Sequence, residues 1–340
     1  PVVLALADRF SAEDRPRFGD SEVIHVPVSG PVQIGYALAL VKALLAARLD
    51  CLHLHGIWMY PSHAARRWRE ATGRASVISP HGMLDRWITA RGRWKKVLAR
   101  RGYERAGWRA ASAFHALTPR EAEDIARESG RRDSLVIPNA GPPVAAPVRE
   151  PRAPHLLFLS RINPKKNLAP LIAAWREVAG AGGIPDDARL TIAGWGEPAD
   201  VTALQELLRG SPPSLRFIGP CFGEDKAREL AAARFVVLPS LSEGLPMTLL
   251  EAWAAGTPTL QSAECNLSAG LAAGAALDCG MDQPAIKAAL VQALTMPDDR
   301  WLAMAQAAQG LASGTFSGKR VAQQWGEAYA RLIAEPGALP

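Results

Sequence analysis

The stretch Leu238-Pro-Ser-Leu-Ser-Glu-Gly-Leu-Pro-Met-Thr-Leu-Leu-Glu-Ala-Trp-Ala-Ala-Gly-Thr-Pro258 combines a strand end, a polar loop and a helix. The apolar run Phe235–Leu238 predicts a short buried strand. Apolar residues then recur at the spacing of one helical face, at Leu249, Leu250, Trp253 and Ala254. Glu243 therefore falls on the loop and Glu251 on the helix. Pro246 stands near the first helical turn, whose backbone N–H groups can bind an anion, so we expect a phosphate beside Glu243.

Strand-like and helix-like stretches alternate along the chain, which is typical of parallel doubly wound sheets. In the first half we expect strands at Val2–Ala7, Glu22–Val26, Cys51–His55 and Ser76–Ser79, and a helix at Ile34–Leu49. In the second half we expect strands at Leu156–Leu159, Leu190–Ala193, Leu215–Ile218 and Phe235–Leu238. Five prolines between Pro142 and Pro154 predict a linker between the halves.

Composition is that of an ordinary globular protein. A length of 340 residues allows about two domains, and 48% hydrophobic residues are enough for two cores. The four cysteines form no Cys-x-x-Cys pair, which favours buried thiols in a reducing compartment over disulfides or a metal finger. No run of eighteen apolar residues and no signal sequence is present, so we expect a cytoplasmic protein.

The stretch around Glu243 and Glu251 resembles a known family. The Glu-x7-Glu spacing, the run Glu-Gly-Leu-Pro, and the later Leu-Glu-Ala and Gly-Thr-Pro are similar to glycosyltransferase family 4, whose members are retaining enzymes. The resemblance implies an α/β protein of the GT-B fold, with two Rossmann-like doubly wound domains that face each other across a cleft. It implies an acceptor domain over residues 1–145, a nucleotide-sugar domain over 146–315, and a final helix over 316–340 that crosses back to the first domain.

A second motif, Ser160-Arg-Ile-Asn-Pro-Lys-Lys-Asn-Leu168, follows a predicted strand and precedes a helix. Arg161 and Lys166 therefore lie where the carboxyl edge of the sheet opens into a crevice, and two cations there suit a pyrophosphate. The resemblance implies that this Arg and Lys bind the donor's diphosphate and neutralise the charge of the departing nucleotide. Asn167 stands where the family often has glycine.

The resemblance also implies the rest of the donor site. Glu243 reaches the donor sugar and is a candidate catalytic residue with Arg161 and Lys166, while Glu251 accepts hydrogen bonds from the ribose. Two strand ends rich in glycine allow the backbone to approach a ligand closely. The further donor-binding candidates are Gly194, Trp195, Pro220, Gly244, Leu245, Pro246, Met247 and Thr248. The family needs no metal and no cofactor besides the nucleotide diphosphate sugar that is its donor substrate.

Two motifs mark the first half, Leu52-His-Leu-His-Gly-Ile-Trp-Met59 and Ser79-Pro-His-Gly-Met-Leu-Asp-Arg-Trp87. Both are similar to stretches in family 4 enzymes that assemble bacterial exopolysaccharides, and this resemblance implies that His81 is catalytic and lies in the cleft. It further implies an acceptor pocket lined by His55, Gly56, Trp58, Gly82 and Asp85. His53 and His55 share one face of a strand, yet no carboxylate or cysteine accompanies them, so a metal site is not favoured.

The sequence departs from the family pattern in two places. The glycine-rich loop after the family's first strand has no counterpart, so we expect that strand and loop to be missing from the sequence. The run Asn266-Leu-Ser-Ala-Gly270 stands where related enzymes have Asn-Leu-Pro-Glu-Gly, and a contact made by that Glu is lost.

Positive charge is concentrated in one segment. Residues Arg86–Arg109 hold nine Lys or Arg and one acid, Glu104, so their net charge is +8, whereas the whole chain carries +6 and the remainder 6 − 8 = −2. Tryptophan and tyrosine are interleaved with these cations, which is typical of a segment on an anionic membrane surface. A solvated helix face is the alternative. No recognition motif for nucleic acid accompanies the segment.

The sequence thus predicts a retaining glycosyltransferase that moves a sugar from a nucleotide diphosphate sugar to a glycan or polyprenyl-linked glycan acceptor. Its place would be bacterial surface polysaccharide synthesis in the cytoplasm, with peripheral contact to the inner face of the membrane. Two alternatives remain open: a nucleotide-sugar 2-epimerase of the same fold, and a noncatalytic partner that binds sugar nucleotide or membrane.

Overall fold

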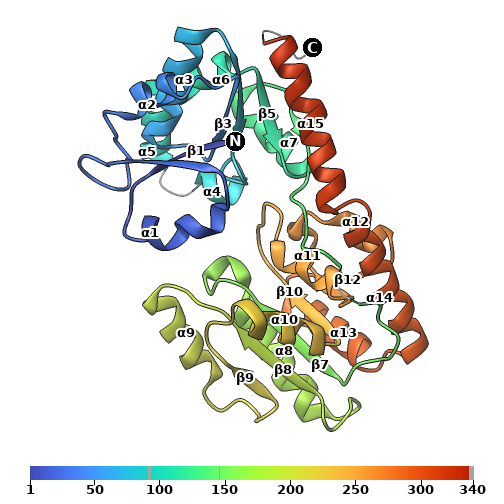
Figure 1. The fold of residues 1–340 in the computed structure, drawn as a ribbon. Coiled ribbons are helices and arrows are strands. Elements are labelled where there is room, and N and C mark those ends of the chain that lie inside the picture. Colours follow the sequence, from blue (N-terminus) through green and yellow to red (C-terminus); the bar gives the residue numbers. More distant parts are fainter. Residues whose placement is uncertain (91–92, 145, 337–340) are drawn as a thin grey trace. The chain divides into compact units, whose positions relative to one another are not determined.

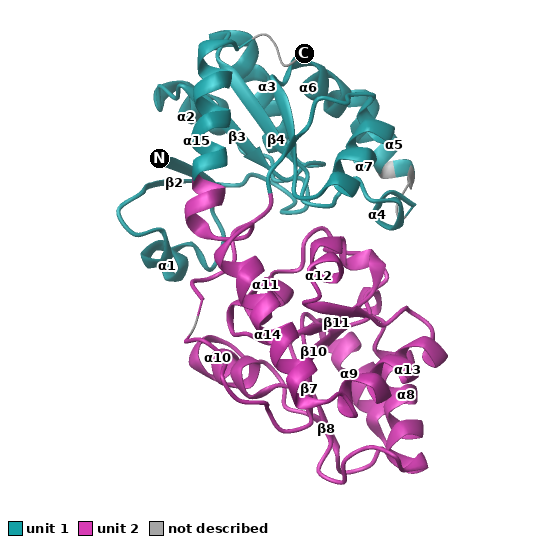
Figure 2. Ribbon diagram, turned by 90° about the vertical axis from the view of Figure 1, so that its right-hand side faces the viewer, with its two compact units in different colours: residues 1–137, 323–340 teal, residues 138–322 magenta. Residues whose placement is uncertain are grey.

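The computed structural model describes residues 1–90, 93–144 and 146–336. The chain divides into two compact units, coloured in Figure 2. Unit 1 contains residues 1–137 and the chain from Gln323 onward, and unit 2 contains residues 138–322. The domain boundaries expected from sequence, after residues 145 and 315, lie a few residues from these divisions.

Unit 1 contains two parallel sheets. A four-stranded sheet has the order β3 (Cys51–His55), β4 (Ala75–Ser79), β5 (Ala113–Ala116), β6 (Leu135–Val136), and a separate pair joins β1 (Val2–Leu6) to β2 (Glu22–Val26). One apolar cluster spans both sheets, with Leu4 of β1, Leu52 of β3 and Trp68 of α3 among its members. The two sheets therefore share one hydrophobic core, although no strand of one is hydrogen-bonded to a strand of the other.

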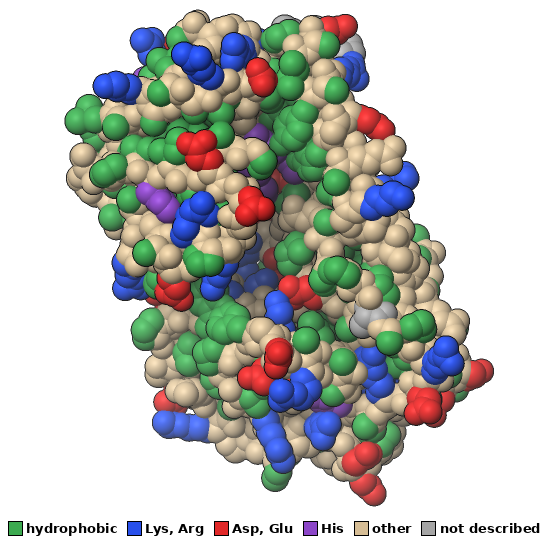
Figure 3. All heavy atoms as spheres, in the orientation of Figure 1, with side chains coloured by type: hydrophobic (Ala, Val, Ile, Leu, Met, Phe, Trp, Pro, Cys, Tyr) green, Lys and Arg blue, Asp and Glu red, His purple; other side chains and the backbone are tan. Residues whose placement is uncertain are grey.

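The helices of unit 1 follow the strands in sequence (Figure 1). They are α1 (Ser11–Asp14), η1 (Arg15–Phe18), α2 (Leu40–Ala46), α3 (Tyr60–Thr72), α4 (Arg86–Ala90), α5 (Arg93–Ala99), the π-helical turn η2 (Arg100–Glu104), α6 (Arg105–Ala110) and α7 (Pro119–Ser129). Hydrophobic side chains gather on the part of the surface that unit 1 forms in Figure 3.

Two expectations about elements were wrong. The helix predicted at Ile34–Leu49 begins only at Leu40, because Gly35 has a left-handed backbone (φ 62°) that an α-helix cannot contain. The strands β5, β11 (Thr259–Gln261) and β12 (Ala276–Asp278) were not predicted. They are three or four residues long and too short to show a strand periodicity.

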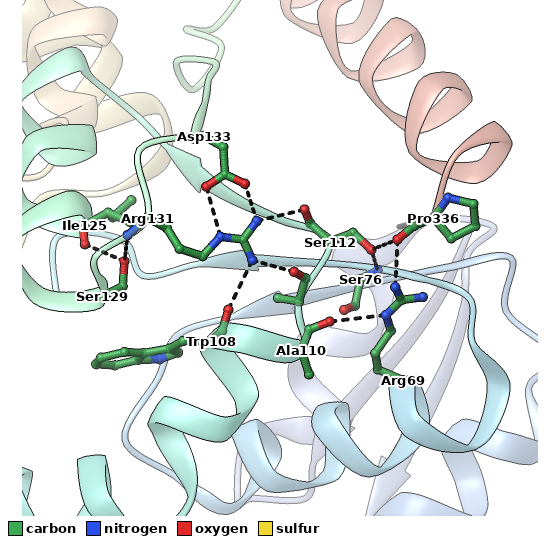
Figure 4. Close-up of polar contacts among 11 residues, drawn as sticks. Arg69, Ser76, Trp108, Ala110, Ser112, Ile125, Ser129, Arg131, Asp133 and Pro336 are labelled. Atoms are coloured by element: carbon green, nitrogen blue, oxygen red, sulfur yellow. Dashed lines mark hydrogen bonds and ion pairs between the residues drawn. The ribbon is translucent and has the colours of Figure 1, made fainter. Parts of the chain in front are cut away.

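The last helix, α15 (Gly318–Ala334), ends on unit 1. Leu332 is buried against Ala75, Val77 and Ala113 of the four-stranded sheet. Beyond the helix, the Pro336 carbonyl accepts hydrogen bonds from Ser112 Oγ and Arg69 Nη2, both at 2.7 Å (Figure 4). Figure 4 also shows the guanidinium of Arg131 bound to backbone carbonyls and to Asp133. Polar contacts thus fasten the end of the chain.

Unit 2 is a doubly wound domain. Its described residues form one parallel sheet in the order β12, β11, β10 (Phe235–Leu238), β7 (His155–Leu159), β8 (Arg189–Ala193), β9 (Leu215–Phe217). The strand order reverses between β7 and β10, which pair through Leu156 with Phe235 and Leu157 with Val236. A ligand crevice is expected beyond the carboxyl ends of these two strands.

Helices connect the strands of unit 2 and also follow its last strand, β12. They are η3 (Pro164–Lys166), α8 (Leu168–Ala181), α9 (Pro198–Leu208), α10 (Gly223–Ala232), α11 (Met247–Ala254), η4 (Ala263–Cys265), α12 (Ser268–Ala272), α13 (Gln283–Leu294) and α14 (Asp298–Ser313). The expected linker Pro142–Pro154 has no helix or strand in its described residues. Arg152 holds it to unit 2 by donating to the carbonyls of Ala233 (2.9 Å) and Ala255 (2.7 Å).

Two glycines allow one backbone to cross another at the carboxyl edge of the sheet. An added Cβ at Gly194 would lie 1.9 Å from the Ser160 carbonyl oxygen, and one at Gly196 would lie 2.3 Å from that of Ile162. The space beside both glycines is thus taken by the main chain that carries Arg161. The packing of two strand ends thus requires both glycines. The expected role of Gly194 beside the donor stays a prediction.

We predict that Gly194→Ala destabilises unit 2 by about 2 kcal/mol or more, because backbone atoms must move to admit the methyl group. Gly180→Ala is the matched control, since Gly180 lies in α8 with no atom near its Cβ position and alanine is a better helix former. Thermal and urea unfolding of the two variants would measure the difference. Equal stability would show that the crossing of the two strand ends is not tight.

Candidate active site

Lys166 and Glu243 meet at the point where the strand order of unit 2 reverses. Lys166 follows β7, Glu243 follows β10, and their side chains form an ion pair with 11% and 12% of their surfaces exposed. Ser240 Oγ also donates a hydrogen bond to Glu243, at 2.7 Å. A largely enclosed ammonium beside a carboxylate can bind an anionic group and a hydroxyl group together. The structure therefore brings together two of the four residues expected to be catalytic, Lys166 and Glu243.

The loop before Lys166 is shaped by two asparagines. Asn163 caps η3 by accepting a hydrogen bond from Lys165 N (3.0 Å). Asn167 has a left-handed backbone (φ 58°), a conformation that Gly and Asn adopt most readily. Its amide donates to the carbonyls of Pro239 (3.1 Å) and Met281 (2.7 Å). Asn167 thus holds a backbone conformation that glycine also adopts readily, and its side chain donates two hydrogen bonds.

The loop that carries Glu243 is held from a segment later in the chain. Glu243 N donates to the Glu264 carbonyl (3.0 Å), and the Asn266 amide donates to the carbonyls of Glu243 and Gly244. Asn266 also has a left-handed backbone (φ 58°). In the sequence, Asn266 stood out only as part of the run that departs from the family pattern, and no role was expected for it. Its role depends on a contact across 23 positions, which no local pattern reveals.

Arg161 lies at a more open place than Lys166. Its guanidinium pairs with Glu197 at 3.0 Å, with 49% of its side chain exposed, and stands 5.2 Å from the centre of the Trp195 ring. Trp195 is 46% exposed and Pro220 is also exposed. An exposed aromatic face beside a cation is a surface on which a planar base can stack.

The other donor-site candidates lie along the loop and the start of α11. Met247 is exposed, and Gly244, Thr248 and Glu251 are half-buried. Leu245 and Pro246 are buried. Pro246 is the residue before α11 and not part of its first turn. The Glu251 carboxylate is bound by Lys226, whose Nζ lies 2.8 Å from Oε1.

In unit 1, the site candidates His55 and His81 also contact each other. His55 Nδ1 and His81 Nε2 are 2.8 Å apart, and the two exposed rings stack with centroids 5.1 Å apart. Burial lowers the pKa of both imidazoles, and for His81 its neighbour His55 adds to this. His81 (φ 51°) and Trp58 (φ 74°) have left-handed backbones, a strained state that clusters at functional sites.

Two buried carboxylates hold these strained strand ends. Glu104 accepts a hydrogen bond from Trp58 N and Glu121 accepts one from Gly82 N, both at 2.5 Å. Desolvation raises the pKa of both carboxyl groups. In the sequence, Glu104 stood out only as the one acid of the basic segment. Glu121 also takes part in the cap of α7, since its backbone N donates to Thr118 Oγ1 (3.2 Å).

The remaining acceptor candidates are less open to a ligand. Trp58 is half-buried, its ring packs on Trp108 at 5.8 Å, and its backbone carbonyl accepts from Tyr103. Gly56 has a left-handed backbone (φ 82°) at the end of β3. Asp85 accepts a hydrogen bond from Trp87 N at 2.7 Å, so its carboxylate organises the start of α4.

A chain of hydrogen bonds runs behind the two histidines. It links Tyr329 Oη to His53 Nδ1, His53 Nε2 to Ser79 Oγ, and Ser79 Oγ to His115 Nδ1, each at 2.6 Å. His115 Nε2 ends the chain at the Ile137 carbonyl, 2.7 Å away. A carbonyl only accepts, so we assign the Nε2–H tautomer to His115 and, in turn, to His53.

No group of three His, Cys, Asp or Glu side chains is arranged to hold a metal ion within the residues that the structure describes. The four cysteines are thiols. Burial raises the pKa of all four.

The basic segment Arg86–Arg109 is only partly a solvated surface. Gly107 and Trp108 are buried beside Glu104, whereas three apolar side chains of α5 lie exposed: Trp94 (66%), Val97 (41%) and Leu98 (63%). Their i, i+3, i+4 spacing places them on one helical face. A cavity of about 290 Å³ beside them is lined by Arg86, Thr89, Ala90, Lys96, Val97, Arg100 and Glu128. Over the described residues, no helix has the length and apolarity to span a membrane.

Comparison with known proteins agrees with this geometry. Residues 2–140 match the family model described as "Glycosyl transferase 4-like domain", and residues 153–296 match "Glycosyl transferases group 1". The chain is 29% identical over 184 residues to O-antigen chain mannosyltransferase B of Escherichia coli. That match covers 52% of this chain and 46% of the relative, so the chain spans about half the length of the curated relative it matches.

The fold is shared with solved structures. HepE of Anabaena in complex with UDP-glucose has a TM-score of 0.76 at 18% identity, and the match covers 97% of this chain and 92% of that one. Sucrose-phosphate synthase of Thermosynechococcus elongatus has a TM-score of 0.71 at 18% identity, with 98% and 99% covered. Two Rossmann-like parallel α/β domains of this kind define the GT-B class of glycosyltransferases. With its two family models over residues 2–140 and 153–296, the chain belongs to glycosyltransferase family 4.

The neutral histidines make unit 1 sensitive to acid. Burial lowers the pKa of His115 from 6.5 to about 4, so below pH 6.5 the unfolded chain binds a proton that the folded chain does not. Stability therefore falls as the pH drops from 6.5 toward 4. We predict a loss of about 2 kcal/mol from His115 alone at pH 5.

Thermal unfolding at pH 7 and pH 5 would measure this loss, with His115→Gln as the comparison because it keeps polar partners and does not titrate. The variant should be less stable at pH 7 and lose less between the two pH values. An equal loss in both proteins would contradict the assignment.

Proposed function

We propose that this protein transfers a sugar from a nucleotide diphosphate sugar to a glycan or lipid-linked glycan acceptor, with retention at the anomeric carbon. The observation that carries the proposal is the Lys166–Glu243 pair at the reversal of strand order, in a chain of family 4. The bound sugar nucleotide of HepE and the O-antigen role of the Escherichia coli relative support the donor class and the polysaccharide setting.

The charges at the crevice suit a diphosphate leaving group. Lys166 and Arg161 offer two cations to the phosphate oxygens, and they stabilise the negative charge that grows there as the glycosidic bond breaks. Glu243 accepts hydrogen bonds from the donor sugar's hydroxyl groups and orients its anomeric carbon. The departing phosphate oxygen takes the acceptor's proton on the same face, which yields retention. In this scheme the two cations supply the positive charge, and no metal or further cofactor is required.

Unit 1 supplies the acceptor side in this proposal. His81 is the proposed catalytic residue of this unit, and His55, Gly56, Trp58, Gly82 and Asp85 are the proposed acceptor-binding residues. Support comes from the exposed His55–His81 pair and from the strained backbone that Glu104 and Glu121 hold in place. Strain of this kind is retained where it positions a functional group.

We further propose that the basic segment binds an anionic membrane at the inner face of the cell membrane. Trp94 and Leu98 are large, apolar and exposed, and they are surrounded by the positive charge of Arg86–Arg109. Apolar side chains enter the headgroup layer while cations attract anionic lipid. Such contact would bring the enzyme to a lipid-linked acceptor.

The donor proposal predicts selective stabilisation by one nucleotide. A thermal-shift series with UDP, GDP, ADP and dTDP should raise the melting temperature with one of them most strongly, since only the folded protein binds it. The Lys166→Met variant should then bind that nucleotide about tenfold or more weakly, because a charge-assisted hydrogen bond is lost. The Glu243→Gln variant should still bind the nucleotide. Its rate of sugar transfer, measured as nucleotide released from the nucleotide-sugar donor, should fall by about a hundredfold or more.

Lys287→Met serves as control for these variants, since Lys287 forms an ion pair with Glu177 at 2.8 Å away from the crevice. It should change neither binding nor turnover. Absence of a shift with every nucleotide, or normal turnover in Glu243→Gln, would refute the proposal.

The membrane proposal predicts binding to vesicles that contain phosphatidylglycerol and little binding to pure phosphatidylcholine. The double variant Trp94→Ser, Leu98→Ser should bind at least about fivefold more weakly, since two apolar side chains no longer enter the bilayer. Val32→Ser with Leu38→Ser is the control, because these side chains are as exposed (69% and 70%) and lie outside the basic segment. Sedimentation with vesicles measures all three proteins. Equal loss in both double variants, or no loss in either, would contradict a specific membrane face.

A further inference from the structure

A second ion pair in unit 2 has a lysine that the proposed reaction does not use. Lys226 of α10 places its Nζ 2.8 Å from Glu251 Oε1 of α11. Both helices follow strands of the sheet, β9 and β10; Lys226 stands in the first half of α10, and Glu251 stands near the middle of α11. The pair therefore lies toward the carboxyl edge of the sheet, on the side where a ligand is expected.

The Lys226–Glu251 pair has unused hydrogen-bonding capacity. An ammonium carries three N–H donors and a carboxylate two acceptor oxygens. Within the described chain, Glu251 is the one hydrogen-bond acceptor of the Lys226 side chain, and Lys226 is the one donor to the Glu251 carboxylate. Two donors and one carboxylate oxygen thus remain for water or for a ligand.

Comparison with the Lys166–Glu243 pair shows the difference. That pair is 11% and 12% exposed and receives a further hydrogen bond from Ser240. The Lys226 and Glu251 side chains are 30% and 20% exposed. The second pair is thus partly enclosed, fixed by its own salt bridge and open on one side.

A donor and an acceptor held side by side are complementary to two neighbouring hydroxyl groups. Each hydroxyl can give its proton to a carboxylate and accept a hydrogen bond from an ammonium. We infer that Lys226 acts with Glu251 as a clamp for the ribose diol of the nucleotide, with Glu251 accepting the hydroxyl protons and Lys226 donating to a hydroxyl oxygen. This inference rests on the proposed function and adds Lys226 as a specificity-determining residue.

The clamp selects ribonucleotides over 2′-deoxyribonucleotides. A nucleotide without the 2′-hydroxyl leaves the free carboxylate oxygen and the free ammonium donors of this pair without a ligand hydrogen bond, and such a loss discriminates more strongly than a change of shape. Removal of the Lys226 ammonium should therefore weaken the binding of a ribonucleotide and hardly affect the binding of its 2′-deoxy counterpart.

The test measures dissociation constants by calorimetry for UDP and 2′-deoxy-UDP, for GDP and 2′-deoxy-GDP, and for inorganic pyrophosphate. We expect the wild type to bind either UDP or GDP more tightly than the other. It should bind that ribonucleotide about tenfold or more tightly than the 2′-deoxy form of the same nucleotide. Lys226→Met should bind that ribonucleotide about fivefold to tenfold more weakly and retain its affinity for the deoxy form and for pyrophosphate. Lys226→Arg should keep most of the preference, and Lys287→Met all of it, with melting temperatures that confirm folded protein.

The outcomes separate the two proposals. If the wild type binds a nucleotide but does not discriminate against its deoxy form, or if Lys226→Met keeps the discrimination, the clamp is refuted and the donor site stands. If Lys226→Met weakens the ribonucleotide, the deoxy form and pyrophosphate alike, Lys226 acts only through charge or structure and the clamp is again refuted. If the wild type binds none of these nucleotides, the donor site and the clamp both fail.

Discussion

The parallel pairing of β7 with β10 is the constraint on which the proposed donor site depends. It joins Leu156 to Phe235 in the middle of a buried sheet, so the two strands end at the same edge. Lys166 and Glu243, 77 positions apart, then meet in a place that is nearly closed to water. Each charge would be costly there alone, and together they offset much of that cost. The irregular loops beyond the strands are arranged around this pair.

Irregular backbone needs partners for its polar groups, and the two units use different side chains for this purpose. In unit 2, the amides of Asn167 and Asn266 donate to loop carbonyls beside Lys166 and Glu243. In unit 1, the buried carboxylates of Glu104 and Glu121 accept from the backbone N–H groups of two strand ends. Unpaired backbone groups in these buried places would cost free energy.

The histidines of unit 1 extend this organisation to the end of the chain. Tyr329 of α15 donates to His53, and the ring of Trp325 lies 4.6 Å from that of His115. Beyond the end of this helix, the Pro336 carbonyl accepts a hydrogen bond from Ser112 Oγ. The last helix is therefore part of the support behind His55 and His81, which explains why unit 1 includes the chain from Gln323 onward.

The sequence by itself determined the fold class, the strands with continuous apolar runs, and the motifs at their ends. These depend on local patterns: a buried parallel strand needs an apolar run, and a loop that follows it is read directly from the next residues. The same patterns missed short strands such as Thr259–Gln261 and extended one helix back through Gly35.

Only the tertiary structure decided which side chains meet. Lys226 pairs with Glu251, and the amide of Asn266 donates to the loop that carries Glu243. Glu104, within the basic segment, accepts a hydrogen bond from Trp58 N. Each contact joins residues more than twenty positions apart, and it forms because separate strands and helices pack together. No local spacing encodes such a pairing, since it depends on the free energy of the whole packed domain.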